Sequence, residues 1–455
     1  MSATPVSWVG RPLRALSLRL VRFFYPRLTL EGQERLPERG PVILVANHPN
    51  GLLDPVVLQL AVGQPVRFLA KSTFFRNPFG RAAMAAFGCI PVYRSQDEGR
   101  DEKAAPDSRG ARNEETFALC RQVLREGAWL ALFPEGTSHS DPQMRPLKTG
   151  AARIALSTMA EAAAAGTPVD LVIVPAGLGY EAKSIFRSGV LVRIGQPLRV
   201  GGYLDAHAGD QRAASDALTT DIRAGLAEVV LEAETRDLLE GVARVALWTA
   251  DGKQSDPDPA ALHHRARTLL TAYQAIHDRD PDSVEHITRK VRDYARVLRH
   301  LGVSDPWALE VEEVGAGRVV GAVVKLLAAA PLAALGAVLG WVPYRLAGRV
   351  AKRVVGREFD ILSTVKLLAG SLFLLLAWIG EAVLGALFLR PLVGLAIVLL
   401  APVTGYLALR FEEIAGETVM AVRHLWLRRA HASKVARLVQ RRRALADDVA
   451  RALAG

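Results

Sequence analysis

Hydrophobic and polar positions alternate in a strand-and-helix pattern over the first half of the chain. Between residues 41 and 200, short apolar runs are separated by amphipathic stretches. Such a pattern is typical of an α/β fold with a mixed, mainly parallel sheet flanked by helices, and we expect this domain over residues 28–200. The runs are PVILVAN, VRFLAK, CIPVYR, WLALFPEG, LVIVPAGLGY and VLVRIG.

Several residues that carry chemistry, and one glycine, stand where predicted strands end. Functional sites in parallel sheets form at the carboxyl ends of the strands. We therefore expect these positions to converge although they are far apart in the sequence. They are His48, Arg94, Glu135 and Gly177.

The pattern changes after residue 200. Residues 201–317 are polar, with Ala, Arg, Asp, Glu and His at helical spacing and no strand-like alternation. We predict a helical region and assign it no purpose. The adjacent His263 and His264 suggest a metal ligand pair, but no third ligand stands at a recognised spacing, which favours a solvated helix face.

The stretch 318–410 is much richer in Leu, Val, Ala and Gly than the chain before it, as membrane-spanning sequences are. Three full spans would put the basic residues 411–455 on the far side from the α/β domain, against the positive-inside rule. A re-entrant or interfacial hairpin, broken at Pro331 and followed by two spans, keeps every basic segment on the cytoplasmic side. We prefer the hairpin, and three spans stay the alternative. The basic C-terminus is then a second surface-binding helix or an ordinary solvated one.

Residues 1–27 predict a basic amphipathic helix. Such a helix lies in a membrane interface or packs on its own domain, and both readings stay open. Its arginines interrupt any signal-peptide core, so we expect the front of the protein to stay in the cytosol. The basic arc holds Arg11, Arg14, Arg19 and Arg22, and the apolar arc holds Leu13, Leu16, Leu20, Phe23 and Phe24.

The net charge limits the classes of binding partner, and the cysteine content limits disulfides and metal sites. A net charge of +11 with a pI near 9.9 fits either nucleic acid or an anionic membrane surface. The position of the arginines favours the membrane, so we expect no nucleic-acid partner. Cys89 and Cys120 are too few for a disulfide framework and lack metal-ligand spacing. We therefore expect two reduced thiols and no metal site.

The segment HPNGLLD places His48 directly after a predicted strand and Asp54 at the start of a predicted helix. A neutral imidazole can take a proton from an alcohol if a carboxylate fixes its tautomer and steadies the imidazolium. Gly51 permits the tight turn that brings Asp54 back towards His48. By itself the pair is weak evidence, because a histidine near an aspartate more often caps a helix or fills a core.

A second segment, FPEGTSHSDPQMRPLKTG, runs from a predicted strand through a glycine-containing turn to two cations and a helix. Backbone amides at such a turn, together with a cation, form a receptor for phosphate. An arginine that follows the strand CIPVYR can grip phosphate with two hydrogen bonds. Individually these cations would be ordinary surface residues. The candidate phosphate-binding cations are Arg94, Arg145 and Lys148, and the turn consists of Glu135, Gly136 and Thr137.

In this order and spacing, the blocks resemble the PlsC-like family of glycerophosphate and lysophosphatidate acyltransferases over residues 28–200. The resemblance rests on HPNGLLD, on FRNPFG with GCIPVYR, on FPEGTS and on IVPAGLGY. It implies the glycerophosphate acyltransferase fold, His48 as general base and Asp54 as its orienting acid. It assigns the acceptor phosphate to Arg94, Glu135 and Gly136. It also implies an acyl thioester on coenzyme A or acyl carrier protein as co-substrate, with no bound cofactor.

Two departures resemble one branch of the family. Five residues, where most members have four, separate His48 from Asp54, and Ser138 stands where most members have arginine. Both features resemble the fungal-type glycerol-3-phosphate and dihydroxyacetone-phosphate acyltransferases, as does KSIFRSGVLVRIGQPL with Lys183 and Arg187. This branch implies glycerol 3-phosphate as acceptor, with lysophosphatidate as the alternative. The missing cation would then come from Arg145, Lys148 or Arg187.

Rival classes fit less well. The segment GLGYEA matches a loose dinucleotide fingerprint, but too little chain follows it for a crossover helix before the next strand. A serine hydrolase would need a Gly-x-Ser-x-Gly elbow, which the sequence lacks. An inactive acyltransferase-like protein that binds or scaffolds at a membrane stays as the alternative of another class.

Overall fold

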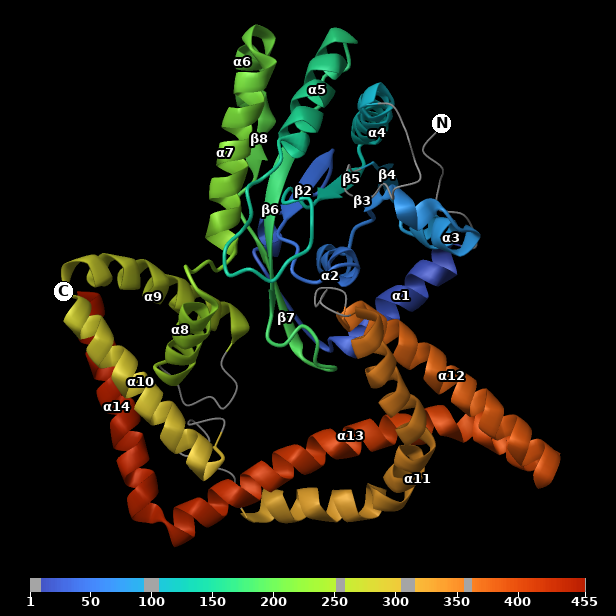
Figure 1. The fold of residues 1–455 in the computed structure, drawn as a ribbon, viewed down its shortest axis with the longest axis vertical. Coiled ribbons are helices and arrows are strands. Elements are labelled where there is room, and N and C mark those ends of the chain that lie inside the picture. The colour runs from blue at the N-terminus through green and yellow to red at the C-terminus, as the bar shows by residue number, and fades with distance from the viewer. Residues whose placement is uncertain (1–9, 94–105, 251–257, 304–315, 356–361, 455) are drawn as a thin grey trace. The chain divides into compact units, whose positions relative to one another are not determined.

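The computed structural model describes residues 10–93, 106–250, 258–303, 316–355 and 362–454. The chain divides into two compact units. The first comprises Met1–Glu232 and Glu358–Thr364, and the second comprises Ala233–Arg357 and Val365–Gly455. Figure 1 shows the order of the elements along the chain.

The first unit is built on one mixed, mainly parallel sheet, which confirms the predicted fold class. Its strands follow the order β1-β7-β6-β2-β5-β3-β4, and β8 pairs with β6. Only the β6 pairings with β7 and β8 are antiparallel among the described strands. The strands are β1 (Arg27–Glu31), β2 (Val42–Ala46), β3 (Val66–Lys71), β4 (Ile90–Val92), β5 (Trp129–Leu132), β6 (Val172–Tyr180), β7 (Gly189–Ile194) and β8 (Leu198–Arg199).

Helices cover this sheet because its central strands are apolar on both faces. Every residue of β2 and β5 is buried, as expected for parallel strands inside an α/β domain. The α-helices of the unit are α1 (Gly10–Phe24), α2 (Leu53–Val62), α3 (Pro78–Ala86), α4 (Pro106–Arg125), α5 (Gly150–Ala164), α6 (Leu204–Gly209) and α7 (Gln211–Val229). Short 3-10 helices are η1 (Gln33–Arg35), η2 (Ser72–Phe75) and η3 (Val200–Tyr203).

The first unit extends beyond residue 200, where the sequence pattern turned helical. Helix α7 packs on β6, and its apolar side chains belong to the core under the sheet. The sequence did not reveal that α7 belongs to this core, because the helix buries one apolar stripe and its other faces are polar. The buried stripe consists of Leu218, Ile222, Leu226 and Val229.

The apolar arc of helix α1 is partly buried against the domain and partly exposed. It packs against α2 and α3, and Val21 and Phe24 are buried there. Leu16 and Phe23 stay 52% and 39% exposed. The packing reading is therefore confirmed for Val21 and Phe24, and the membrane-interface reading stays a prediction for the exposed side chains.

The second unit contains helices only, in the part of it that the structure describes. Helix α14 packs against α9 and α10, burying Leu438 and Leu445, and Lys290 of α10 forms an ion pair with Asp448. The basic C-terminal helix thus has a packed apolar face. The helices are α8 (Arg236–Trp248), α9 (Pro259–Arg279), α10 (Pro281–Leu301), α11 (Ala316–Val355), α12 (Leu362–Phe388), α13 (Pro391–Ala430) and α14 (Ala432–Ala454).

Among the described residues, three helices are long and apolar enough to cross a membrane: α11, α12 and α13. Helix α11 continues through Pro331 and Pro343, so the reverse turn expected at Pro331 is not formed. A proline within a long helix removes one hydrogen bond and bends the helix without ending it when neighbouring packing supports both sides. That support comes from α13, whose backbone at Thr404 lies so close to Gly336 that a Cβ there would be 2.0 Å from the Thr404 oxygen.

The contact of α7 with β6 gives a first prediction. A Cβ at Gly177 would lie 2.1 Å from the Val229 oxygen, whereas one at Gly179 of the same strand would lie 3.8 Å from the Leu191 oxygen. Gly177→Ala should therefore lower the free energy of unfolding by about 1–3 kcal/mol through overpacking. Gly179→Ala is the matched control and should stay near the parent in thermal unfolding. Equal stability of the two variants would contradict this packing.

Candidate active site

His48 and Asp54 meet at the carboxyl edge of β2. The strand ends at Ala46, the chain turns at Gly51 with a positive φ of 44°, and α2 begins at Leu53. Asp54 lies in the first turn of α2, where the helix dipole favours a negative charge. Its Oδ2 is 2.8 Å from Nδ1 of His48. The predicted pair therefore forms directly, despite the extra residue between its members.

The Asp54 carboxylate is completely buried and has donors on both oxygens. Oδ2 also accepts the backbone N–H of Asn50 at 2.7 Å, and Oδ1 accepts the hydroxyl of Tyr180 at 2.6 Å. Burial and the nearby Asp54 charge raise the pKa of Tyr180 well above its ordinary value, which keeps this hydroxyl a donor. Three donors thus fix the carboxylate in one orientation.

In the imidazole of His48, Nδ1 donates a hydrogen bond to Asp54 and Nε2 is left without one from the described residues. Since Asp54 only accepts, Nδ1 carries the proton and Nε2 presents its lone pair. No described residue forms a hydrogen bond with Nε2. The ring stacks on Phe133 with centroids 3.9 Å apart and planes at 12°, and the side chain is 15% exposed. This arrangement is suited to accepting a proton.

Glu135 holds its own loop. Its carboxylate accepts the backbone N–H of Arg145 at 2.7 Å and pairs with Nε2 of His139, and the side chain is 1% exposed. The His139 Nδ1 accepts the backbone N–H of Asp141 at 3.2 Å, so its Nε2 is the donor to Glu135. These contacts close the loop between β5 and α5.

The side chain of Lys148 lies against the turn at Gly136. Gly136 has φ 77°, and the Lys148 side chain passes so close that a Cβ at Gly136 would be 2.6 Å from Nζ. Lys148 is exposed, and no described carboxylate forms an ion pair with it. Arg145 instead pairs with Asp141 at 2.8 Å. The hydroxyl of Thr137 lies 3.4 Å from the Ser138 carbonyl oxygen.

Lys183 joins the two loops of the site. Its Nζ donates to the Pro49 carbonyl at 2.7 Å and to the Ser140 hydroxyl. The Lys183 carbonyl accepts the hydroxyls of Tyr25 and, at 2.6 Å, of Ser363 at the start of α12. Burial raises the pKa of Tyr25 to about 12, which keeps it protonated. Asn50 Nδ2 donates to the same Tyr25 oxygen at 2.8 Å.

Arg187 and Arg94 are the remaining sequence candidates. The Arg187 backbone N–H donates to the Phe24 carbonyl at 2.7 Å, and its guanidinium lies 5.9 Å from the ring centre of Phe23. Arg187 therefore packs against α1. Arg94 lies outside the described residues.

Sequence reasoning missed several side chains that build the site. Asn50, in the turn between the pair, and Tyr180, at the end of β6, donate to Asp54, and Tyr25 accepts from Asn50. Lys183 was noticed only as part of a branch pattern. Asn50 within HPNG and the tyrosine ending GLGY gave a signal, because polar residues at strand ends face the same edge. Nothing in the sequence paired Lys183 with Pro49.

The fold and these residues define an α/β domain with a carboxylate-held histidine at the carboxyl edge of a mainly parallel sheet. Residues 27–179 match the family model Acyltransferase. The chain therefore carries a domain of the acyltransferase family.

Curated relatives extend the similarity. An uncharacterized acyltransferase of Schizosaccharomyces pombe is 26% identical over 63% of this chain and 53% of its own length. Glycerol-3-phosphate O-acyltransferase 2 of Saccharomyces cerevisiae is 30% identical over 44% of this chain and 26% of its own length. A chloroplastic 1-acyl-sn-glycerol-3-phosphate acyltransferase of Brassica napus is 32% identical over 30% and 35%. The chain thus spans about half, or less, of the length of these relatives.

The Lys183 contacts generate a second prediction. Lys183→Met keeps the aliphatic stem but removes both Nζ hydrogen bonds, so the loops at 47–51 and 135–148 should exchange backbone hydrogen about tenfold faster. Mass-spectrometric hydrogen exchange on the full chain measures this. Arg145→Met, which removes an exposed ion pair in the same loop, is the control and should leave 47–51 unchanged. Unchanged exchange of 47–51 in Lys183→Met would show that Nζ does not restrain the histidine loop.

Proposed function

We propose that this protein is a membrane-bound O-acyltransferase of phospholipid biosynthesis that transfers a fatty acyl group from a thioester to a hydroxyl of glycerol 3-phosphate. The observation that carries the proposal is the 2.8 Å contact of His48 Nδ1 with buried Asp54, which leaves Nε2 open. The family match and the similarity to a yeast glycerol-3-phosphate acyltransferase support it.

In the proposed mechanism, His48 Nε2 accepts the proton of the acceptor hydroxyl while that oxygen attacks the thioester carbonyl. The new C–O ester bond forms, the C–S bond breaks, and the imidazolium returns its proton to the leaving thiolate. Asp54 stabilises the transient imidazolium through Nδ1. Holding both substrates side by side supplies much of the acceleration.

The acceptor phosphate would bind at the turn of Gly136. Positive φ at this glycine lets the backbone approach a ligand closely, and Lys148 supplies a cation that no described carboxylate neutralises. Arg94 and Arg187 stay candidates for further cations. Glu135, as a buried carboxylate bonded to its own loop, would act by shaping this turn for the phosphate.

A second acceptor, 1-acylglycerol 3-phosphate, is favoured by the similarity to the Brassica napus enzyme. The donor thioester would be on coenzyme A or acyl carrier protein. The three apolar helices support membrane association. We place the catalytic domain on the cytoplasmic side of the cell membrane from the arginines of its own helix α1, and three spans would then put the basic C-terminal helix on the other side.

The proposed base gives a third prediction. His48→Ala should lower kcat by about 10²–10⁴-fold, because the hydroxyl loses its proton acceptor. Asp54→Asn should also lower kcat, since the amide cannot stabilise the imidazolium. Release of free thiol with glycerol 3-phosphate as acceptor measures both. His264→Ala, at an exposed histidine of the second unit, is the control. Full activity of His48→Ala would overturn the mechanism, and an inactive parent with every acceptor would favour the scaffold alternative.

The proposed phosphate receptor gives a fourth. Lys148→Met should raise KM for glycerol 3-phosphate about tenfold with a smaller effect on kcat, because the lost contact is to a non-reacting phosphate. The same measurement with 1-acylglycerol 3-phosphate ranks the two acceptors by kcat/KM. KM for the thioester is the internal control and should not change. An equal rise in both KM values would assign Lys148 to general stability of the loop.

A further inference from the structure

A pocket lies at the opposite edge of the sheet from His48. It has a volume of about 450 Å³ and is lined at the first residues of β3 and β5, Val66 and Trp129. These two residues pair in parallel register, and Trp129 also pairs with Val42 at the start of β2. The five residues of β2, roughly 16 Å of strand, therefore separate this pocket from the histidine loop.

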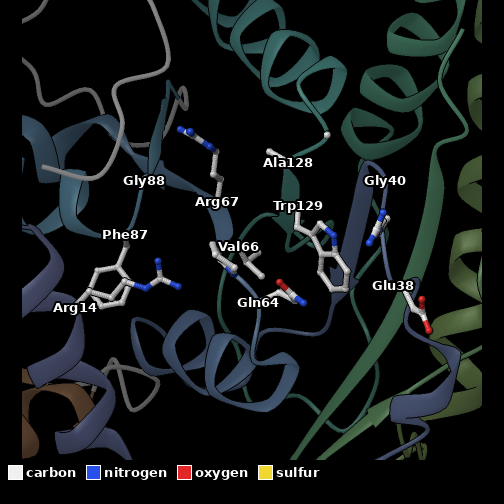
Figure 2. A pocket seen from close by; sticks show the side chains of 13 residues that line it. Arg14, Glu38, Gly40, Gln64, Val66, Arg67, Phe87, Gly88, Ala128 and Trp129 are labelled. Atoms are coloured by element: carbon white, nitrogen blue, oxygen red, sulfur yellow. The ribbon is translucent and has the colours of Figure 1, made fainter.

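Three arginines line this pocket from separate elements. Arg14 comes from α1, Arg39 precedes β2, and Arg67 lies in β3. Figure 2 shows Arg14 and Arg67 with Trp129 around the pocket. No described carboxylate forms an ion pair with any of the three. Glu38 also lines the pocket, so two positive charges remain in excess.

Arg39 is exposed and Arg14 and Arg67 are half-buried, so the three guanidinium groups are accessible to an anion from solvent. Like charges repel, and partial burial lowers the pKa of Arg14 from its ordinary value because it desolvates the guanidinium. Guanidinium groups bind phosphate oxygens with paired hydrogen bonds. Trp129 and Phe87 add an apolar wall that excludes water from one side.

We propose that this pocket binds a phosphate group, separately from the catalytic site. The phosphate belongs to an anionic phospholipid headgroup or to a soluble phosphate ester, and the same three arginines recognise either source. Arg14 links the pocket to α1, whose Leu16 and Phe23 are exposed on the same helix. Phosphate binding here therefore anchors α1 against β3 and the segment before β2.

The test uses the full chain in lipid nanodiscs, with two double variants. Arg39→Gln with Arg67→Gln removes two pocket charges. Arg19→Gln with Arg81→Gln removes two exposed charges of the same unit that do not line the pocket. In the first arm, inorganic pyrophosphate is titrated by calorimetry into phosphatidylcholine discs. In the second, the thermal unfolding midpoint is compared between those discs and discs that contain phosphatidylglycerol.

The difference between the two double variants decides the outcome. A soluble ligand predicts that pyrophosphate affinity falls at least about tenfold in the pocket variant and stays near the parent in the control. A lipid headgroup predicts that stabilisation by phosphatidylglycerol is lost in the pocket variant alone. If the two variants behave alike in both arms, any binding reflects net charge or another site, and the proposal is overturned.

Discussion

The buried carboxylate of Asp54 is the constraint on which the site depends. A carboxylate without solvent exposure is strongly unfavourable unless donors surround it. Here the donors are the His48 imidazole, the Asn50 backbone and the Tyr180 hydroxyl. His48 and Asn50 lie in the turn after β2 and Tyr180 ends β6, so satisfying the charge brings this turn, the start of α2 and the end of β6 to one point. The orientation of the imidazole follows from the same requirement.

Lys183 extends this constraint beyond the pair. Its ammonium holds the carbonyl beside His48 and the hydroxyl of Ser140, and its carbonyl receives Tyr25 and Ser363. Ser363 belongs to the first compact unit although it begins α12, one of the three apolar helices. The start of a membrane-type helix is therefore tied by hydrogen bonds to the loop that presents the proposed base. A shift of that helix end would be transmitted to His48 through Lys183 and Pro49.

The sequence predicted structure well where the interactions that determine it lie within one short segment. Apolar runs predicted the parallel strands because burial on both faces leaves an unbroken hydrophobic pattern, and HPNGLLD predicted the pairing of His48 with Asp54. The sequence predicted structure less well where contacts between distant segments determine it. The sequence assigns Glu135 of FPEGT to the acceptor phosphate, whereas in the structure its carboxylate accepts the Arg145 backbone N–H, which no spacing rule predicts. Pro331 reads as a helix break, yet close packing of α11 on α13 at Gly336 supports a continuous helix.

The extra residue between His48 and Asp54 has a structural explanation in the same hydrogen bonds. Asn50, within this turn, forms two hydrogen bonds that hold it. Its backbone N–H reaches Asp54, and its side chain reaches the Tyr25 hydroxyl that also bonds Lys183. Positive φ at Gly51 then allows α2 to start immediately. The longer spacing therefore keeps a direct histidine–carboxylate contact and connects it to the lysine that joins the two loops of the site.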